Sequence, residues 1–209
     1  IRENLWQSAW EARLFLPLQT KTQRVEMVAQ YHIASVSWGK DSLYMLLELI
    51  RRGYPLDEVF TFDTGMEFQA VYNMRDQAKS LLSYHDIRYT ELTLDRPFTY
   101  YMFEKPVNGR KGFHYGYSWC GGRCRWGTGE KIKAMDRYAE ERNAIVYVGI
   151  AADEEKRLHK PRKKYKRLPL ADWGVTESRA LQGCYTAGYD WREGPVRLYD
   201  ILDRVSCWC

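Results

Sequence analysis

The sequence has no apolar run near the roughly 20 residues that a transmembrane helix requires, and no signal-peptide pattern opens it. It also lacks low-complexity segments and internal repeats. With 45% hydrophobic and 15% aromatic residues, the composition is not that of a disordered chain. We therefore expect a cytoplasmic protein without membrane contact, whose 209 residues suffice for one α/β domain.

Neither sign of charge dominates the chain, which has 32 Lys and Arg against 27 Asp and Glu and a net charge of +5. This small basic excess suits an anionic ligand but does not distinguish a nucleotide from a nucleic acid. The basic residues are densest between Lys156 and Arg167. We interpret this run as a contact for an anionic substrate or nucleic acid, with a solvated mobile loop as the alternative.

The stretch from His32 to Ser42 is typical of a strand, a tight loop and the start of a helix. Apolar residues then recur on one helical face until Gly53, which is placed to end the helix. A helix N-terminus favours anions, because its first N–H groups have no intrahelical partner. Gly39 allows a close approach, Lys40 adds charge, and the hydroxyls of Ser37 and Ser42 can donate to phosphate. The alternative is an ordinary turn with Asp41 or Ser42 as the N-cap.

Further strands are expected over 58–65, 87–94 and 144–150, separated by helical patterns over 68–82 and 130–142, the last with Ile132, Met135 and Tyr138 facing inward. This alternation predicts an α/β fold, a doubly wound parallel sheet in three α/β/α layers. Ligands of such sheets bind at the carboxyl ends of strands, where both Ser37–Ser42 and Asp63–Gly65 fall. Residues 1–30 carry two helix-like patterns and are interpreted as a helical lead-in.

Residues 95–119 are rich in Tyr, Phe and Gly with little periodicity, which predicts a long loop or irregular excursion. We expect its aromatic rings to pack the loop onto the domain. Stacking of nucleic-acid bases on those rings is the alternative.

The segment Ser37-Trp-Gly-Lys-Asp-Ser42 resembles the Ser-x-Gly-x-Asp-Ser signature of the PP-loop, or N-type ATP pyrophosphatase, superfamily, particularly its phosphoadenylyl-sulfate (PAPS) reductase branch. It is not a Walker P-loop. Asp63-Thr64-Gly65 and the Gly149–Arg157 segment resemble further elements of that branch, as does the Leu168–Trp173 stretch before a helix capped at Thr176. Trp38 stands where the family usually has Gly, and Ala151 where it usually has Arg.

The resemblance implies an adenine nucleotide alpha-hydrolase-like domain over 31–209 that binds ATP or a sulfonucleotide (PAPS or APS), with Mg²⁺ if the substrate is ATP. It assigns catalysis to Lys40, Asp41 and Ser42. The nucleotide-binding residues it implies are Ser37, Gly39, Lys40, Asp41, Ser42, Asp63, Thr64, Gly65, Gly149 and Arg157.

Five cysteines, an odd number, in a chain without a secretory signal favour thiols or metal ligands over disulfides. Two close pairs, Cys120 with Cys124 and Cys207 with Cys209, are able to supply four thiolates to zinc or an iron–sulfur cluster. The iron–sulfur members of the resembled branch hold a 4Fe–4S cluster with similarly spaced pairs, so we place the cluster ahead of zinc. The chain begins at Ile1 and ends inside this cysteine group, so we expect trimmed ends and a fourth ligand that can lie beyond Cys209. Cys184 is expected to be a small buried side chain.

Two activities fit the resemblance. A sulfonucleotide reductase needs a mobile cysteine and a thioredoxin-like reductant, but the family's C-terminal Glu-Cys-Gly-x-His tail does not occur in this sequence. An ATP pyrophosphatase or sulfurtransferase, similar to the ATPases of DNA phosphorothioation, needs the loop to hold the β- and γ-phosphates. The alternative outside enzymology is a nucleotide-sensing or nucleic-acid-binding module that uses the basic run from Lys156 to Arg167.

Overall fold

The computed structural model describes residues 30–110, 112–117 and 127–205, so the expected helical lead-in lies almost wholly outside the described part. Within the described residues the main sheet has five parallel strands in the order β3-β2-β1-β6-β7. These strands are β1 (His32–Ser35), β2 (Glu58–Asp63), β3 (Arg88–Thr93), β6 (Ile145–Val148) and β7 (Lys166–Arg167).

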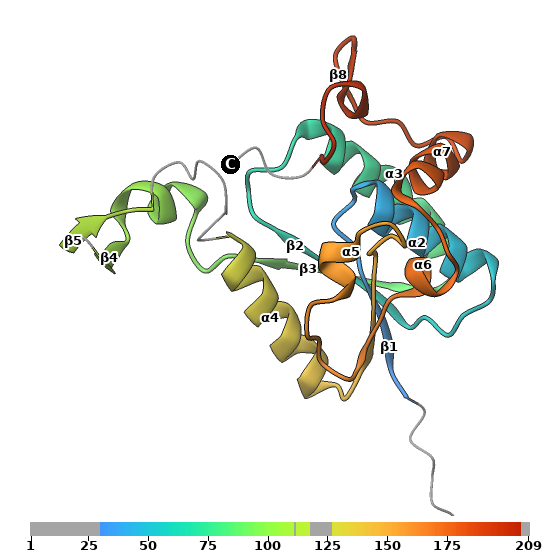
Figure 1. Cartoon of the computed structure of the whole chain (residues 1–209), viewed down its shortest axis with the longest axis horizontal. Helices are drawn as coiled ribbons and strands as arrows, with labels where there is room; N and C mark the ends of the chain where they lie inside the picture. Colours follow the sequence, from blue (N-terminus) through green and yellow to red (C-terminus); the bar gives the residue numbers. More distant parts are fainter. Residues whose placement is uncertain (1–29, 111, 118–126, 206–209) are drawn as a thin grey trace, which may run out of the picture.

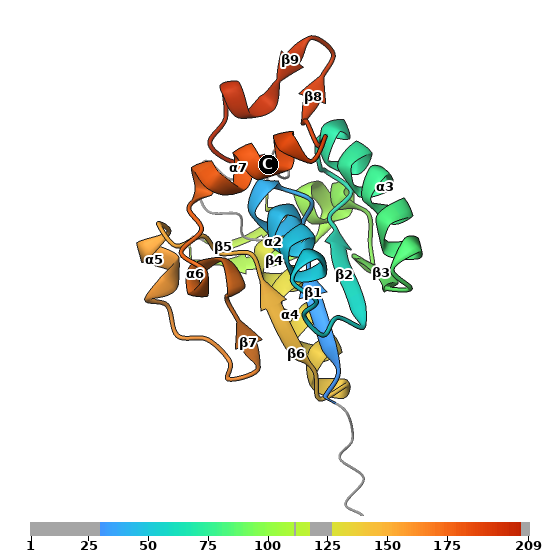
Figure 2. The same cartoon turned by 90° about the vertical axis from the view of Figure 1, so that its right-hand side faces the viewer.

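Helices cover both faces of this sheet, as Figures 1 and 2 show. The helices α2 (Lys40–Arg51) and α3 (Gln69–Tyr84) lie on one face, and α4 (Gly127–Glu141) lies on the other. The expected doubly wound α/β/α fold is therefore confirmed. Because the chain runs outward from β1 to β2 and β3, and then returns to β6 on the other side of β1, the switch point lies between β1 and β6.

The two faces of the sheet bury alternate residues of the same strands. Ala34 and Val59 join a core with α2, α3 and the helix α7 (Glu177–Thr186). Their neighbours Ile33 and Phe60 point to a second core, under α4, together with Val146. The chain therefore presents apolar side chains to both layers of helices, as a central parallel sheet requires.

The helix that follows the first strand ends as its sequence predicts. Gly53 has a φ of +66°, its N–H donates to Ile50 O, and the N–H of Tyr54 donates to Leu49 O. These two bonds form a Schellman motif, which satisfies carbonyls at the helix end and favours glycine at this position. The start of α2 has Gly39 as its N-cap without a side-chain cap, so neither Asp41 nor Ser42 plays that role.

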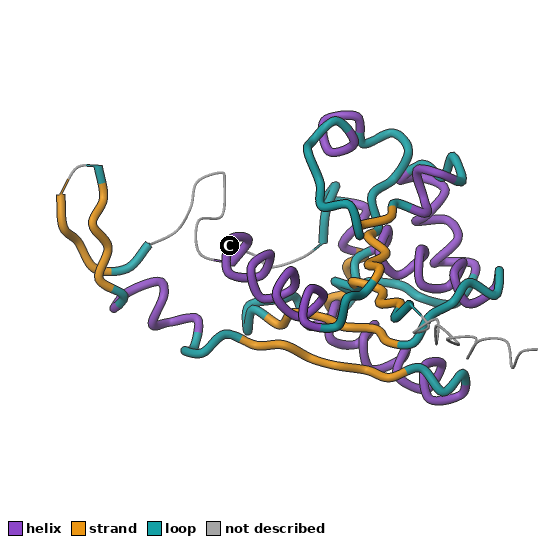
Figure 3. Tube along the Cα trace, turned by 90° about the horizontal axis from the view of Figure 1, so that it is seen from below, coloured by secondary structure: helices purple, strands orange, loops and turns teal. Residues whose placement is uncertain are grey.

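Residues 95–119 are more regular than expected. They contain a π-helical turn η1 (Tyr100–Glu104) and an antiparallel hairpin of β4 (Pro106–Gly109) and β5 (Gly112–Tyr115), which projects from the body of the domain (Figures 1 and 3). The prediction that the aromatic rings of this segment pack onto the domain is confirmed only in part. Tyr101 is buried, but Phe103, Phe113 and Tyr115 are exposed. Asn108 and Gly109 lie within β4, paired with Phe113 and Gly112, so this Asn-Gly sequence is not the turn of the hairpin.

The remaining elements follow β6 and complete the face near α2. They are α5 (Glu155–Leu158), α6 (Pro169–Asp172), α7, the short pair β8 (Arg192–Glu193) and β9 (Val196–Arg197), and the 3₁₀ turn η2 (Leu198–Asp200). Thr176 caps α7 as expected, since its hydroxyl accepts a hydrogen bond from the N–H of Arg179. Among the described residues, none of the helices has the length and apolar character needed to cross a bilayer.

Candidate functional site

The loop from Ser37 to Ser42 joins β1 to α2 through an unusual backbone conformation. Trp38 has a φ of +60°, a left-handed backbone conformation that residues other than glycine rarely adopt. Its ring is buried, and its carbonyl accepts a hydrogen bond of 2.8 Å from Trp191 Nε1. Trp38 is therefore held in place by packing and by a hydrogen bond from a residue far along the chain.

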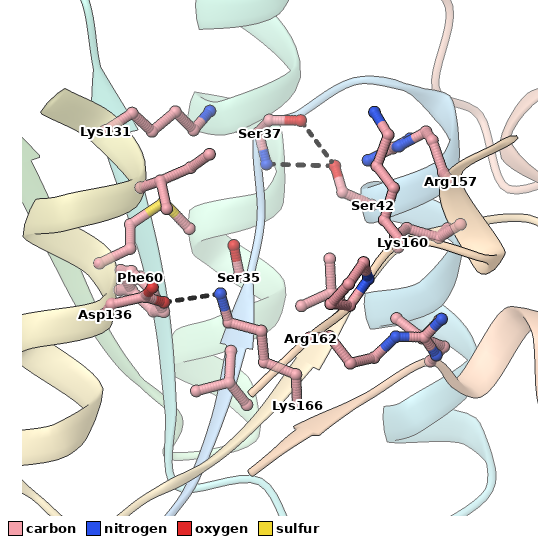
Figure 4. A pocket seen from close by; sticks show the side chains of 18 of the residues that line it. Ser35, Ser37, Ser42, Phe60, Lys131, Asp136, Arg157, Lys160, Arg162 and Lys166 are labelled. Atoms are coloured by element: carbon pink, nitrogen blue, oxygen red, sulfur yellow. Dashed lines mark hydrogen bonds and ion pairs between the residues drawn. The ribbon is translucent and has the colours of Figure 1, made fainter. Parts of the chain in front are cut away.

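Ser42 organises the inside of this loop. Its Oγ accepts from Ser37 N at 3.1 Å and donates to Gly39 O at 3.1 Å, and it lies 3.2 Å from Ser37 Oγ. The two bonds between these serines are drawn in Figure 4. Both hydroxyls line a cavity at the N-terminus of α2, where partial positive charge from the helix favours an anion. The loop thus presents two hydroxyl groups and a helix N-terminus to the cavity, an arrangement that suits an anion.

The cavity has a volume of about 530 Å³ and lies beside the switch point of the sheet. Four cationic side chains of the basic run line it: Arg157, Lys160, Arg162 and Lys166. Figure 4 shows these side chains around the cavity opposite α4. Part of the basic run therefore faces this cavity, whereas Lys163 is paired with Glu140 of α4.

The cavity also has an apolar wall, which continues between the sheet and α4. Phe60, Val146 and Val148 line it from the strands, and Ile132 and Met135 from the helix. Ile132, expected to be buried, is 49% exposed because it borders this open space. A site with cations at one end and apolar walls beyond them suits an organic molecule that carries an anionic group.

Lys40 and Asp41 do not line this cavity. The Nζ of Lys40 lies 2.6 Å from Glu177 Oε2 and 3.1 Å from Asp41 Oδ2, and its side chain is 7% exposed. Burial raises the pKa of Asp41 to about 6, although Lys40 opposes the shift. Their predicted catalytic role stays a prediction, because the structure places both in a salt-bridged group next to the cavity.

The second predicted segment divides between two hollows. Asp63 Oδ1 accepts from Gly65 N at 2.7 Å and from the Tyr72 hydroxyl at 2.8 Å, a turn that faces a neighbouring hollow lined also by residues 94–99. Thr64 borders both hollows, and its hydroxyl donates to Glu67 Oε1 at 2.9 Å. Burial raises the pKa of Glu67, a cavity residue that the sequence reasoning missed.

The segment after β6 closes the cavity on its other side. A Cβ on Gly149 would come within 2.7 Å of Ser42 Cα, so only glycine lets the ends of β6 and α2 approach this closely. Arg157 lies 2.7 Å from Glu154 Oε2, and Arg204 lies 2.6 Å from the same atom. Ala151 is buried, and its N–H donates to Glu154 Oε1 at 3.0 Å.

Four of the predicted site residues, Ser37, Ser42, Thr64 and Arg157, therefore present side chains to one cavity, and Gly149 forms part of its wall. Gly39, Lys40, Asp41, Asp63 and Gly65 lie around it without lining it. Asp136 and Lys131 of α4 line it and were missed. The spacing of Lys131 with Met135 and of Ile132 with Asp136, each four residues apart on one helix face, was the available signal.

The predicted metal ligands Cys120, Cys124, Cys207 and Cys209 lie outside the described residues, so a cluster or zinc site rests on the sequence pattern alone. Cys184 is buried in α7 as expected, and its Sγ lies 3.4 Å from Lys40 O. Burial raises the pKa of this thiol. Within the described part of the chain, no group of three or more His, Cys, Asp or Glu side chains is placed to hold a metal ion.

Fold and cavity together define a doubly wound α/β protein with a cavity beside the switch point of its parallel sheet, lined by hydroxyl groups and cations that suit an anion. No protein-family model matches the chain, and neither does any curated protein sequence. Among solved structures it is similar to the U34-tRNA thiolase NcsA from Methanococcus maripaludis with its [4Fe-4S] cluster, at 15% identity and a TM-score of 0.48. The match covers 80% of this chain and 60% of that one, and likeness at this level carries no conclusion about substrate or reaction.

Proposed function

We propose that this chain is an ATP-using enzyme of the PP-loop superfamily that binds the nucleotide in the cavity beside Ser37–Ser42. One observation carries the proposal: the serine hydroxyls and the α2 N-terminus open onto the same cavity as Arg157, Lys160 and Arg162. A polyphosphate is the ligand that such a site suits, because it accepts many hydrogen bonds and carries several negative charges. The adjoining apolar wall gives room for a nucleoside.

The reaction that suits this arrangement is nucleotidyl transfer. An acceptor oxygen attacks the α-phosphorus, a new P–O bond forms, and the bond to the bridging oxygen breaks so that pyrophosphate leaves with its electron pair. Donors from the loop and the three cations would hold the β- and γ-phosphates and offset the charge that develops on the leaving group. Mg²⁺ is commonly bound largely by phosphate oxygens, so a set of protein ligands is not required.

Ser42→Ala tests the phosphate site. The variant loses the three loop contacts of the hydroxyl, so its Kd for ATP with Mg²⁺ should rise at least about tenfold, measured by calorimetry. Ser80→Ala, at an exposed position of α3, is the matched control and should bind as the parent chain does. Equal affinity of both variants, with unchanged circular dichroism, would reject this placement of the phosphates.

Turnover distinguishes the candidate activities. Release of pyrophosphate from ATP supports nucleotidyl transfer, whereas release of sulfite from PAPS or APS with a reduced thioredoxin-like protein supports the reductase. Binding without either product supports a nucleotide-sensing or nucleic-acid-binding module. The acceptor class that we propose is one whose activated oxygen is later replaced by sulfur, in keeping with the sulfur chemistry of the resembled family.

The proposed enzyme also contains an iron–sulfur cluster, and this part of the proposal is supported only by the spacing of cysteines in the sequence. Protein purified without oxygen should contain iron and acid-labile sulfide, and Cys120→Ser should lower both, whereas Cys184→Ser should leave the iron content unchanged because Cys184 is buried in α7. Zinc without sulfide would assign the cysteines to a zinc site instead. A folded chain with neither metal would reject both assignments.

A further inference from the structure

The cavity extends well beyond its phosphate end. Lys166 pairs in register with Val146, which pairs with Ile33, so it lies four residues before Ser37 along the direction of β1. At the usual rise per residue of a strand, that is about 13 Å from the loop. The inner part of the cavity between β1, β6 and α4 is therefore deep enough to hold a part of the ligand other than its phosphates.

A charged pair lines this inner part, with the apolar wall between it and the loop. Lys166 Nζ lies 2.6 Å from Asp136 Oδ1, and the Tyr165 hydroxyl donates to the same oxygen at 3.0 Å. Both donors act on Oδ1, so Asp136 Oδ2 accepts from neither of them. The side chains of Asp136 and Lys166 are 17% and 24% exposed, and both line the cavity (Figure 4).

The pair offers a directional set of donors and acceptors to a planar ligand. A carboxylate has acceptor capacity on both oxygens, and an ammonium group has three donors, of which this pair uses one. The wall between Phe60 and Val146 of the sheet and Met135 of α4 is apolar, as the faces of a heterocyclic base require. An ion pair in such surroundings is costly compared with apolar packing, which favours a role in recognition.

Resting on the proposed function, we propose that the inner part of the cavity binds the nucleotide base and reads it through Asp136 and Lys166. Asp136 Oδ2 accepts a hydrogen bond from the exocyclic amino group of adenine, and Lys166 Nζ donates to ring nitrogen N1. Tyr165 is a positioning residue, because its hydroxyl holds Asp136 Oδ1 and leaves Oδ2 directed to the ligand.

Three ligands separate this inference from the function on which it rests. ATP carries the amino group, purine riboside triphosphate lacks it, and inorganic tripolyphosphate has no base. The parent chain should bind ATP about tenfold more tightly than purine riboside triphosphate, since a hydrogen bond to a charged group is lost. Asp136→Asn should reduce that preference to about threefold or less and leave the Kd for tripolyphosphate unchanged.

Asp172→Asn, at an exposed position of α6, is the control and should keep the full preference for ATP. Equal binding of ATP and purine riboside triphosphate by the parent chain overturns the inference, even if no variant folds. An equal loss of tripolyphosphate binding in Asp136→Asn assigns the pair to holding α4 against β7 and also overturns it. Failure of the parent chain to bind either ATP or tripolyphosphate overturns the proposed function itself.

Discussion

At the scale of single residues, Asp41 belongs to a salt-bridged group that fixes the loop on the side away from the cavity. Its carboxyl group is buried beside Lys40, which also reaches Glu177 of α7. Burial raises the pKa of Asp41 to about 6, and the carboxylates of Glu177 and Glu154 act in the same direction against the opposing charge of Lys40. Ionised Asp41 therefore costs folding free energy at neutral pH, within the loop that the proposed ligand must contact.

This cost should be measurable as a pH dependence of stability. Because folded Asp41 keeps its proton to a higher pH than in the unfolded chain, its contribution is full below about pH 4 and is lost as pH rises through about 6. The free energy of unfolding of the parent chain, relative to that of Asp41→Asn, should fall by about 2 kcal/mol from pH 4 to pH 7. Urea denaturation at a series of pH values measures it.

Asp172→Asn, the same substitution at an exposed position, serves as the control in that series. The difference in the free energy of unfolding between the parent chain and Asp172→Asn should not fall by a comparable amount from pH 4 to pH 7. A difference between parent and Asp41→Asn that stays constant from pH 4 to pH 7 would show that the Asp41 carboxyl titrates normally in the folded chain.

At the scale of elements, the packing of α7 on α2 depends on a glycine in the middle of a helix. A Cβ at Gly183 would come within 2.0 Å of the Tyr44 ring, so the two helices approach closely only without a side chain there. Gly129 in α4 is also helical, but among the residues that the structure describes a Cβ at that position would meet no atom within 4 Å. The two positions separate the effect of helix propensity from that of close packing.

Alanine substitutions at these two glycines should therefore have opposite effects. Gly129→Ala should stabilise the chain by roughly 0.5–1 kcal/mol, because alanine loses less conformational freedom in a helix. Gly183→Ala should destabilise it by about 1–3 kcal/mol, because the added methyl group must displace Tyr44. Chemical denaturation of both variants measures the sign, and a gain in stability at both positions would contradict the close approach of α7 to α2.

Elements were more predictable from the sequence than the contacts between them. The position of β1, the helix after it and the stop at Gly53 follow from local patterns of apolar residues and a glycine in the left-handed conformation. The hairpin after η1 was missed because its two strands have only four residues each, which is too short for a clear alternation of apolar and polar residues. Local patterns also cannot predict where the side chain of Lys40 points, because it pairs with Glu177, a residue 137 positions further along the chain.

At the scale of the whole molecule, the last described residues lie against the first loop. The Tyr199 hydroxyl accepts a hydrogen bond of 2.9 Å from Lys40 N, over a separation of 159 residues. A Cβ on Gly39 would lie 3.2 Å from Val205 O. Together with the hydrogen bond from Trp191 Nε1 to Trp38 O, these contacts make the segment from 191 to 205 a support for the loop, which no motif within 37–42 could have predicted.

Removal of one hydroxyl should test that support. Tyr199→Phe keeps the ring, which lies 5.0 Å from that of Trp191, but leaves the N–H of Lys40 without its acceptor. The free energy of unfolding should fall by about 1 kcal/mol, and the amide proton of Lys40 should exchange faster with solvent. Tyr84→Phe, with a side chain at an 84% exposed position, should change neither quantity; unchanged exchange at Lys40 in Tyr199→Phe would contradict the support.

This long-range support has a consequence for folding during translation. The loop around Lys40 is synthesised 159 residues before Tyr199, which at roughly 5–20 residues per second is a wait on the order of ten seconds. During that interval β1, α2 and β2 can assemble, but the acceptor for Lys40 N and the partner of Trp38 O do not yet exist. The loop around Lys40 thus reaches its final hydrogen bonding only after Trp191 and Tyr199 have been synthesised.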